Sequence, residues 1–304
     1  MSDDPIEAWL DGAFPSMAPL REQLRRGARS DAPLLIVGEP GVGRTSLARA
    51  LHSASPRATR ALVEVDVGSI PVELFESDLF GHVAGAFTGA ERERIGKIGA
   101  ALGGTLLLDR VEELPISVQP KLLRFLSERV YSPLGGRETS SDVRVLAVAS
   151  HDLALRVERG DFRRDLFHRL EVIAFEIPPL RRRPGDLEAA LPTLLDDLSR
   201  RYGRAELAIA EEDLRWMLEH AWPGNLRQVR NLLERAAVLQ GEGVLRLARP
   251  VAAADERPRT LEETERAAIV QALSYTRGHQ GKAAALLGIS RKGLWEKRKR
   301  HGIP

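Results

Sequence analysis

The chain has 304 residues, of which 43% are hydrophobic and 29% charged, and it contains no cysteine. This length exceeds the usual size of one domain, so we expect two or three units with buried cores. The lack of cysteine excludes a disulfide scaffold, a cysteine nucleophile and a thiolate zinc site. The apolar runs are too short to cross a bilayer, and the start of the chain, MSDDPIEAW, has no signal-peptide pattern. The composition therefore predicts a soluble, cytoplasmic protein with no membrane partner.

Positive charge is concentrated at the carboxyl end of the chain. Residues 277–304 hold eight Lys or Arg residues against one anion, Glu296, which gives this segment a net charge of +7. Since the whole chain carries +2, residues 1–276 carry −5. A basic appendage on a mildly acidic body indicates a separate module that binds a polyanion.

Aliphatic runs and amphipathic stretches alternate in the first part of the chain. The runs and the clearest stretches between them are 34–37, 45–53, 62–67, 105–109, 118–128 and 143–149. This alternation predicts a parallel sheet with helices on both faces. Later segments show only helical periodicity, interrupted by a linker rich in alanine, proline and charge. We therefore expect a short N-terminal segment (1–13), an α/β domain (14–177), a helical domain (178–247), a linker (248–259) and a small all-α domain (260–304).

A glycine-rich loop, GEPGVGRT, follows the first aliphatic run and opens a helix. Its glycines let backbone N–H groups face a phosphate, and the helix N-terminus adds partial positive charge. In such a loop Thr45 would ligate Mg²⁺. Arg44 stands where lysine is usual, and a planar guanidinium is no simple substitute for a compact ammonium. A plain Gly/Pro turn is the alternative. The predicted nucleotide-binding residues are Gly38, Glu39, Pro40, Gly41, Val42, Gly43, Arg44, Thr45 and Ser46.

A second nucleotide motif ends the run at 105–109 with Asp109, whose carboxylate would hold Mg²⁺. The next residue, where hydrolytic proteins of this class carry a glutamate that activates water, is Arg110. Arginine does not act as a general base, because its pKa is out of reach. Glu112 and Glu113 follow, but we expect local geometry to aim them away from the strand end. A core strand with a solvated end is the alternative. The motif predicts weak or absent ATP hydrolysis.

The segment GAFTGA follows FGH and combines small residues with one aromatic and one threonine. Such a loop suits contact with a partner more than packing in a core. With the preceding FGH, it resembles the AAA+ domain of bacterial sigma-54-dependent transcription activators, also called bacterial enhancer-binding proteins. The resemblance implies that the loop contacts sigma-54 and transmits nucleotide-dependent movement to the RNA polymerase holoenzyme. The residues concerned are Gly85, Ala86, Phe87, Thr88, Gly89 and Ala90.

Other segments match this family in order, so that the resemblance covers nearly the whole chain. DFRRDLFHRL resembles the segment that supplies arginine fingers, which implies that role for Arg163 and Arg169. A finger that reaches a neighbouring subunit's γ-phosphate stabilises charge in the transition state. WPGNLRQVRN resembles the second sensor motif, which implies that Asn225 caps a helix and that Arg227 reaches the nucleotide.

Departures from the family pattern gather where hydrolysis would occur. Besides Arg44 and Arg110, Ser150 stands at the position of the first sensor asparagine. Asp66 replaces the asparagine that normally restrains the catalytic glutamate. Because Asp66 and Arg110 are exchanged together at positions that should face each other, we predict an ion pair between them.

The basic tail is predicted to form three helices from residue 261 onward. The second ends at Gly288, and Ser290 is a good N-cap for the third. Two short helices with a tight turn form a helix-turn-helix, whose last helix would enter the major groove. The segment resembles the Fis-type domain that ends many sigma-54 activators and dimerises through its first helix. A basic surface helix is the alternative. The predicted DNA contacts are Ser290, Arg291, Lys292, Lys297 and Arg298.

The sequence thus predicts an α/β P-loop AAA+ domain, an α-helical lid and a small all-α helix-turn-helix domain. The implied function is a sigma-54-dependent regulator that binds promoter or enhancer DNA, uses ATP and Mg²⁺, and contacts the polymerase. It would act as a homo-oligomer, from dimer to hexamer, or in a mixed ring with a paralogue. Since about a dozen residues precede the core, we expect no receiver, GAF or PAS domain. The alternative function is a non-hydrolysing pseudo-ATPase that serves as a DNA-binding modulator, repressor or partner subunit of an active paralogue.

Overall fold

The computed structural model describes residues 4–204, 207–240, 243–248, 265–266, 268–270, 272–273, 276 and 279–301. Contacts between Cα atoms divide the chain into two compact units, residues 1–247 and residues 248–304. No helix in this described part of the chain is long and apolar enough to cross a membrane.

A five-stranded parallel sheet forms the centre of the first unit, with strand order β2-β5-β8-β1-β9. The strands are β1 (Leu34–Gly38), β2 (Leu62–Asp66), β5 (Thr105–Asp109), β8 (Arg144–Ala149) and β9 (Ile173–Ile177). The predicted strands are confirmed, and β9 adds an edge strand that was not identified separately. Because all strands run in parallel, their carboxyl ends meet at one edge of the sheet, where Asp66 is paired with Asp109 in register.

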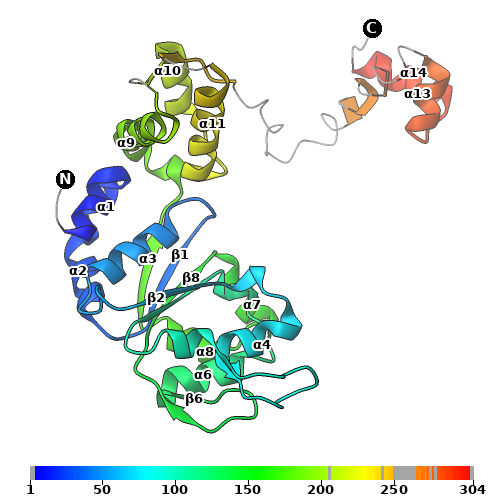
Figure 1. Ribbon diagram of the computed structural model, residues 1–304. Helices are drawn as coiled ribbons and strands as arrows, with labels where there is room; N and C mark the ends of the chain where they lie inside the picture. Colours follow the sequence, from blue (N-terminus) through cyan, green and yellow to red (C-terminus); the bar gives the residue numbers. More distant parts are fainter. Residues whose placement is uncertain are drawn as a thin grey trace. The chain divides into compact units, whose positions relative to one another are not determined.

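Helices cover both faces of this sheet, as the alternation predicted (Figure 1). One face packs against α1 (Pro5–Ala13), α2 (Arg21–Arg29) and α3 (Arg44–Ser53). The other packs against α4 (Val72–Phe80), α5 (Lys97–Ala100), α6 (Gln119–Glu128), α7 (Asp152–Arg159) and α8 (Arg164–Leu170). Successive strand residues alternate between the two cores: Leu34 and Ile36 lie in one, and Leu35 lies in the other.

Short 3₁₀ turns and two small hairpins connect these elements. The turns are η1 (Pro15–Leu20), η2 (Val67–Ser69), η3 (Val111–Glu113) and η4 (Leu180–Arg182). The hairpins pair β3 (Gly81–His82) with β4 (Arg94–Ile95) and β6 (Val130–Tyr131) with β7 (Thr139–Ser140). The GAFTGA segment lies between β3 and β4, so it forms the tip of the first hairpin.

The lid follows η4 and consists of α9 (Pro184–Tyr202), α10 (Glu211–Glu219) and α11 (Asn225–Gln240), with a core of its own (Figure 1). The prediction that residues 178–247 are helical was wrong in one detail. Two-residue strands β10 (Ala208–Ile209) and β11 (Val244–Leu245) pair in parallel beside the helices. β10 forms by pairing with a segment that follows α11. The periodicity of residues within a short window does not reveal such a pairing between distant segments.

The second unit contains α13 (Gln280–Leu286) and α14 (Arg291–Arg300). Its small core joins Ile269, Ala272, Ala283, Ala284 and Leu294. The predicted first helix, from residue 261, lies partly outside the described residues, and the residues described between 265 and 273 are helical. The cap predicted for the third helix is confirmed, because the Ser290 Oγ accepts a hydrogen bond from the Gly293 N–H at 3.0 Å.

Candidate functional site

The glycine-rich loop connects β1 to α3 at the carboxyl edge of the sheet, beside the end of β5. There the Thr45 hydroxyl donates a hydrogen bond of 2.8 Å to Oδ2 of Asp109. A hydroxyl and a carboxylate oxygen side by side suit Mg²⁺, which takes one or two protein ligands and completes its shell with phosphate and water. No group of three or more His, Cys, Asp or Glu that could hold a metal occurs among the described residues. The donor set therefore fits a metal that arrives with a nucleotide.

Two glycines of the loop have backbones in the left-handed region, Gly41 with φ of 82° and Gly43 with φ of 106°. Neighbouring segments also leave no space for a side chain. A Cβ on Gly41 would lie 2.4 Å from the carbonyl oxygen of Gly224, and one on Gly43 would lie 2.4 Å from the Phe14 ring. The loop thus contacts the lid on one side and the N-terminal segment on the other.

Arg44 is buried and folds back on its own loop, where Nη1 donates a hydrogen bond of 2.9 Å to the carbonyl of Gly38. Burial lowers the pKa of its guanidinium, an effect that the carboxylates of Glu112 and Asp109 oppose. The longer arginine thus reaches a backbone carbonyl inside the loop, a contact that keeps its charge close to the expected phosphate position.

Arg110, at the position of the hydrolytic glutamate, is held by neighbouring carboxylates. Its backbone is left-handed, with φ of 58°, and its Nε donates a hydrogen bond of 2.7 Å to Oδ1 of Asp66. A second nitrogen, Nη2, contacts the same oxygen, and Nη1 lies 3.3 Å from Glu113. The ion pair predicted between Asp66 and Arg110 is confirmed. This pair raises the pKa of Arg110, so the group at this position stays cationic.

The expectation that Glu112 and Glu113 both point away from the strand end was wrong for Glu112. Its side chain is buried, and Oε1 accepts a hydrogen bond of 3.0 Å from the backbone N–H of Ser150, which follows β8. The tight turn of η3 places Glu112 on the inner side and Glu113 on the outer side beside Arg110. In the sequence, the position of Glu112 three residues after Asp109 was the only signal that its side chain lies on the inner side.

The lid is held to the loop by Glu39, a member of the predicted nucleotide set. Both Glu39 oxygens accept hydrogen bonds from Arg181, at 2.6 and 2.8 Å, and one also accepts from Asn225 at 3.1 Å. Arg181 holds the pKa of the Glu39 carboxyl at about 2, well below its ordinary value. This clasp connects the phosphate loop, η4 and the start of α11.

The prediction that Asn225 caps a helix was wrong. Asn225 is fully buried as the first residue of α11, and its side chain bridges other segments. Oδ1 accepts a hydrogen bond from the Leu180 N–H at 2.7 Å, and Nδ2 donates to Glu39 and to the carbonyl of Pro40. The side chain therefore joins the lid to the loop. Arg227 lies on the first turn of α11, with its Cβ 2.9 Å from the position of a Cβ on Gly41.

An aromatic pair that belongs to none of the sequence motifs also covers the loop. The rings of Trp9 and Phe14 stack with centroids 4.0 Å apart, and Trp9 Nε1 donates a hydrogen bond of 3.1 Å to the Ser46 hydroxyl. Ser46 in turn donates to the Gly43 carbonyl at 2.7 Å. Part of segment 1–13, which was predicted to be separate from the α/β domain, therefore packs in the same core as α3.

The two candidate arginine fingers differ in their surroundings. Arg163 is exposed and forms a forked pair with Asp165, with distances of 3.0 and 2.7 Å. Arg169 donates from Nε and Nη2 to the carbonyl of Leu126, at 3.2 and 3.0 Å, and so is bound within its own chain. Only Arg163 is presented on the surface in this arrangement.

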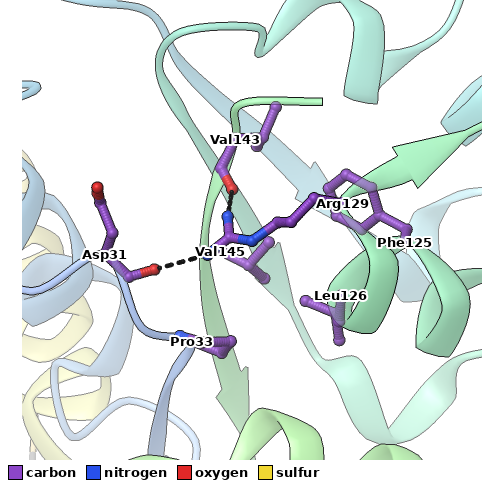
Figure 2. Close-up of a pocket in the computed structure, with 7 residues that line it drawn as sticks. All are labelled: Asp31, Pro33, Phe125, Leu126, Arg129, Val143 and Val145. Atoms are coloured by element: carbon purple, nitrogen blue, oxygen red, sulfur yellow. Dashed lines mark hydrogen bonds between the residues drawn. The ribbon is translucent and has the colours of Figure 1, made fainter. Parts of the chain in front are cut away.

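A small cavity of about 10 Å³ adjoins the Leu126 end of α6 (Figure 2). Figure 2 shows Arg129 donating to the backbone carbonyls of Val143 and Asp31 beside it, at 2.8 and 3.3 Å. Asp31 precedes β1 and Val143 precedes β8, so this cavity lies at the amino-terminal edge of the sheet, away from the loop. It has room for about one water molecule and no substrate.

The GAFTGA hairpin exposes only part of its predicted contact set. Gly85, Phe87, Thr88 and Gly89 are exposed, whereas Ala86 is half-buried and Ala90 is buried. The Gly85 N–H donates to the Ala90 carbonyl at 2.7 Å and closes the tip. The Phe87 ring is 43% exposed and meets His82 edge-on at 5.0 Å. An exposed aromatic held at the tip of a closed loop is available to a partner.

The cations of the second unit are unevenly presented. Arg291 and Lys292 are exposed, but Lys297 forms an ion pair with Glu265, and both Lys297 and Arg298 are half-buried. Lys299 and Arg300, which the predicted contact set omitted, are exposed on α14. The Arg291 guanidinium packs beside Gly281, where a Cβ would lie 2.5 Å from Nη2.

Family models match three successive parts of the chain. Residues 10–176 match the model described as the sigma-54 interaction domain. Residues 181–266 match the AAA+ ATPase lid domain, and residues 260–301 match the bacterial regulatory protein model of the Fis family.

Curated relatives match almost the whole of this chain. The alginate biosynthesis regulator AlgB of Pseudomonas aeruginosa is 38% identical over 304 residues, which cover 97% of this chain and 68% of AlgB. The C4-dicarboxylate transport regulator DctD of Rhizobium meliloti is 40% identical over 97% of this chain and 64% of DctD. The Nif-specific regulatory protein of Azotobacter vinelandii is 38% identical over 94% of this chain and 57% of its own length. The chain thus spans 57–68% of the length of these relatives.

Solved structures of NtrX from Brucella abortus share the fold. One has a TM-score of 0.73 and 30% sequence identity, and covers 96% of this chain and 69% of NtrX. A second, with ATP bound, has a TM-score of 0.72 and 28% identity, and covers 94% of this chain and 68% of NtrX. The motifs, the fold and these matches agree that the chain belongs to the family of sigma-54-dependent transcriptional regulators, with an AAA+ domain, a lid and a Fis-type helix-turn-helix.

Proposed function

We propose that this chain regulates transcription by binding ATP with Mg²⁺ at Gly38–Ser46 and contacting sigma-54 RNA polymerase holoenzyme through the GAFTGA hairpin. Its helix-turn-helix binds promoter or enhancer DNA in the cytoplasm, and the AAA+ domain assembles into homo-oligomers or into rings with a paralogue. The hydrogen bond between Thr45 and Asp109 carries the nucleotide assignment, because it holds two Mg²⁺ ligands side by side. NtrX structures with ATP and with ADP support it by similarity.

In this proposal the chain's own residues divide the work around the nucleotide. The loop N–H groups and the N-terminus of α3 bind the phosphates, and Arg227 approaches them from the lid. Thr45 and Asp109 would hold Mg²⁺, which neutralises phosphate charge when bound. Glu39 couples the loop to the lid through Arg181 and Asn225. An exposed Arg163 supplies the finger to a neighbouring subunit.

A second candidate function is a non-hydrolysing modulator, repressor or partner subunit. The ion pair between Arg110 and Asp66 favours it, because a cation occupies the position from which water would be activated. Both functions use the same nucleotide, DNA and sigma-54 surfaces, so ATP turnover separates them.

The deciding experiment measures ATP binding and ATP turnover side by side on the purified chain, over a concentration series that permits rings. Binding with turnover that rises with concentration supports the self-sufficient activator. Binding with no turnover at any concentration supports the modulator. Absence of ATP binding, with the protein folded, contradicts both nucleotide roles.

The proposed polymerase contact has its own test. Phe87→Ala is expected to abolish binding to sigma-54 holoenzyme and leave DNA binding unchanged, because the ring is exposed at the hairpin tip. Leu74→Ala on α4 removes a side chain that is 56% exposed outside the hairpin and serves as the matched control. Equal polymerase binding by both variants would contradict the assignment.

A further inference from the structure

One buried carboxylate near the end of β5, Glu112, has no role in the sequence motifs or in the family match. Glu112 is only 6% exposed, and Oε1 accepts a hydrogen bond from the Ser150 N–H. Its other oxygen, Oε2, is buried without a hydrogen-bond partner in the described part of the chain. A buried carboxylate oxygen without a donor is unfavourable, so a donor is expected in a working state of the site.

The other ionic groups near Asp109 are engaged elsewhere. Asp109 accepts from Thr45, and Arg110 is bound to Asp66 and Glu113. Arg110 cannot serve Glu112 without breaking these contacts, and Asp109, as a carboxylate, has no proton to donate.

Arg44 remains as the donor for Glu112. Glu112 is bound to the N–H of Ser150, which follows Ala149 on β8, and Ala149 is in register with Val37 on β1, the residue before Gly38. Glu112 therefore lies at the same edge as the Gly38 carbonyl that Arg44 contacts, and its charge raises the pKa of the Arg44 guanidinium against the effect of burial. Arg44 is buried and has one hydrogen bond, from Nη1 to the Gly38 carbonyl. A guanidinium carries five N–H donors in a planar fork, so it can serve two acceptors on different edges.

The charges of the site make such a bridge useful. Asp109 and Glu112 both place negative charge near the Arg44 guanidinium. An incoming phosphate competes with the Gly38 carbonyl for the Arg44 fork. A lysine ammonium is a point charge that matches two acceptors less well, which gives Arg44 a role that a lysine would lack.

We propose that Glu112 is a positioning residue of the nucleotide site, whose free oxygen receives a hydrogen bond from Arg44 when the guanidinium leaves Gly38 and turns to a bound phosphate. Arg44 and Glu112 then form a matched pair in place of the usual loop lysine. The inference rests on the proposed function, because it requires nucleotide binding at the loop.

The test is a double-mutant cycle on the full chain, with Mg²⁺-ADP as the probe and its affinity measured by calorimetry. Glu112→Gln keeps an acceptor for the Ser150 N–H and removes the free carboxylate oxygen. We expect it to weaken ADP binding about tenfold in the wild-type background, as for the loss of one charge-assisted hydrogen bond. In an Arg44→Lys background the same change should alter affinity less than about twofold, since the bridge is already lost.

Glu113→Gln provides the matched control, since Glu113 is a neighbouring glutamate that faces Arg110 outside the pocket. It should leave ADP affinity unchanged in both backgrounds. An equal loss for Glu112→Gln in both backgrounds would show that Glu112 acts only through Ser150, and tighter binding would show that it repels phosphate. Either result overturns the inference. If the wild-type chain is folded and binds no ADP, the proposed nucleotide function itself fails. If the chain binds ADP but Glu112→Gln has the same effect in both backgrounds, only the inference on Glu112 fails.

Discussion

The nucleotide pocket has a binding side, where Thr45 meets Asp109 and Glu39 is clasped by the lid, and a hydrolytic side, where Arg110 is paired with Asp66. The binding side keeps the glycines, Thr45 and Asp109 of its motifs, has Arg44 in place of the usual lysine, and adds contacts with the lid. On the hydrolytic side, three residues depart from the family pattern, namely Asp66, Arg110 and Ser150. In the proposed function, nucleotide binding and hydrolysis depend on separate contacts, so that one can be altered while the other remains.

The largest effect is expected when the family's residue types are restored at two positions of the hydrolytic side. Arg110→Glu combined with Asp66→Asn returns a carboxylate and its amide partner to the pocket. We expect ATP turnover to rise about 100-fold, a usual contribution of a positioned general base. Turnover is measured on assembled protein at saturating ATP. Arg110→Glu with Asp66 retained is the control, and no gain in the double variant would mean that Ser150 or Arg44 also blocks hydrolysis.

The next largest effect is expected on the free energy of unfolding when the side-chain amide that joins the binding side to the lid is removed. Asn225→Ala leaves the N–H of Leu180 without its acceptor in a buried position and removes the donor to Glu39. We expect the free energy of unfolding to fall by about 2–4 kcal/mol, measured in urea. Asn231→Ala, an exposed asparagine on the same helix, is the control and should change it by less than about 0.5 kcal/mol. Equal effects would contradict the clasp.

The pH dependence of the clasp follows from Glu39. Its pKa is about 2 in the folded chain and 4.5 ordinarily, so its stabilisation is complete above about pH 4.5 and is lost as pH falls toward 2. The Arg181 side chain is 44% exposed, so screening reduces the contribution to about 1 kcal/mol. The difference in unfolding free energy between wild type and Glu39→Gln should shrink over this range. A constant difference from neutral pH to pH 2 would contradict the ion pair.

The smallest expected effect comes from the exposed pair on the hydrolytic side. The side chains of Arg110 and Asp66 are 37% and 51% exposed, so Asp66→Asn should lower the free energy of unfolding by about 0.5 kcal/mol. High salt should remove most of this difference, because exposed charges are screened. A larger loss that persists in high salt would mean that Asp66 does more than pair with Arg110.

Local patterns predicted the scaffold of the site well. The end of β5 at Asp109 and the cap at Ser290 depend on residues close together in the chain, and the structure has them as expected. The pairing of Asp66 with Arg110 was also predicted, because two exchanged residues at facing positions of neighbouring strands form a complementary pair. Fold class and family follow from such local signals.

The sequence by itself thus determined the parallel sheet, the phosphate loop and the basic tail, since periodicity, glycine placement and charge are read within short windows. Only the tertiary structure decided that Glu112 turns inward to Ser150 and that Phe14 covers Gly43. It also decided that Asn225 bridges to Glu39, a residue 186 positions away in the chain. Contacts between distant segments depend on how whole elements pack, and a single residue type at one position carries no information about its distant partner.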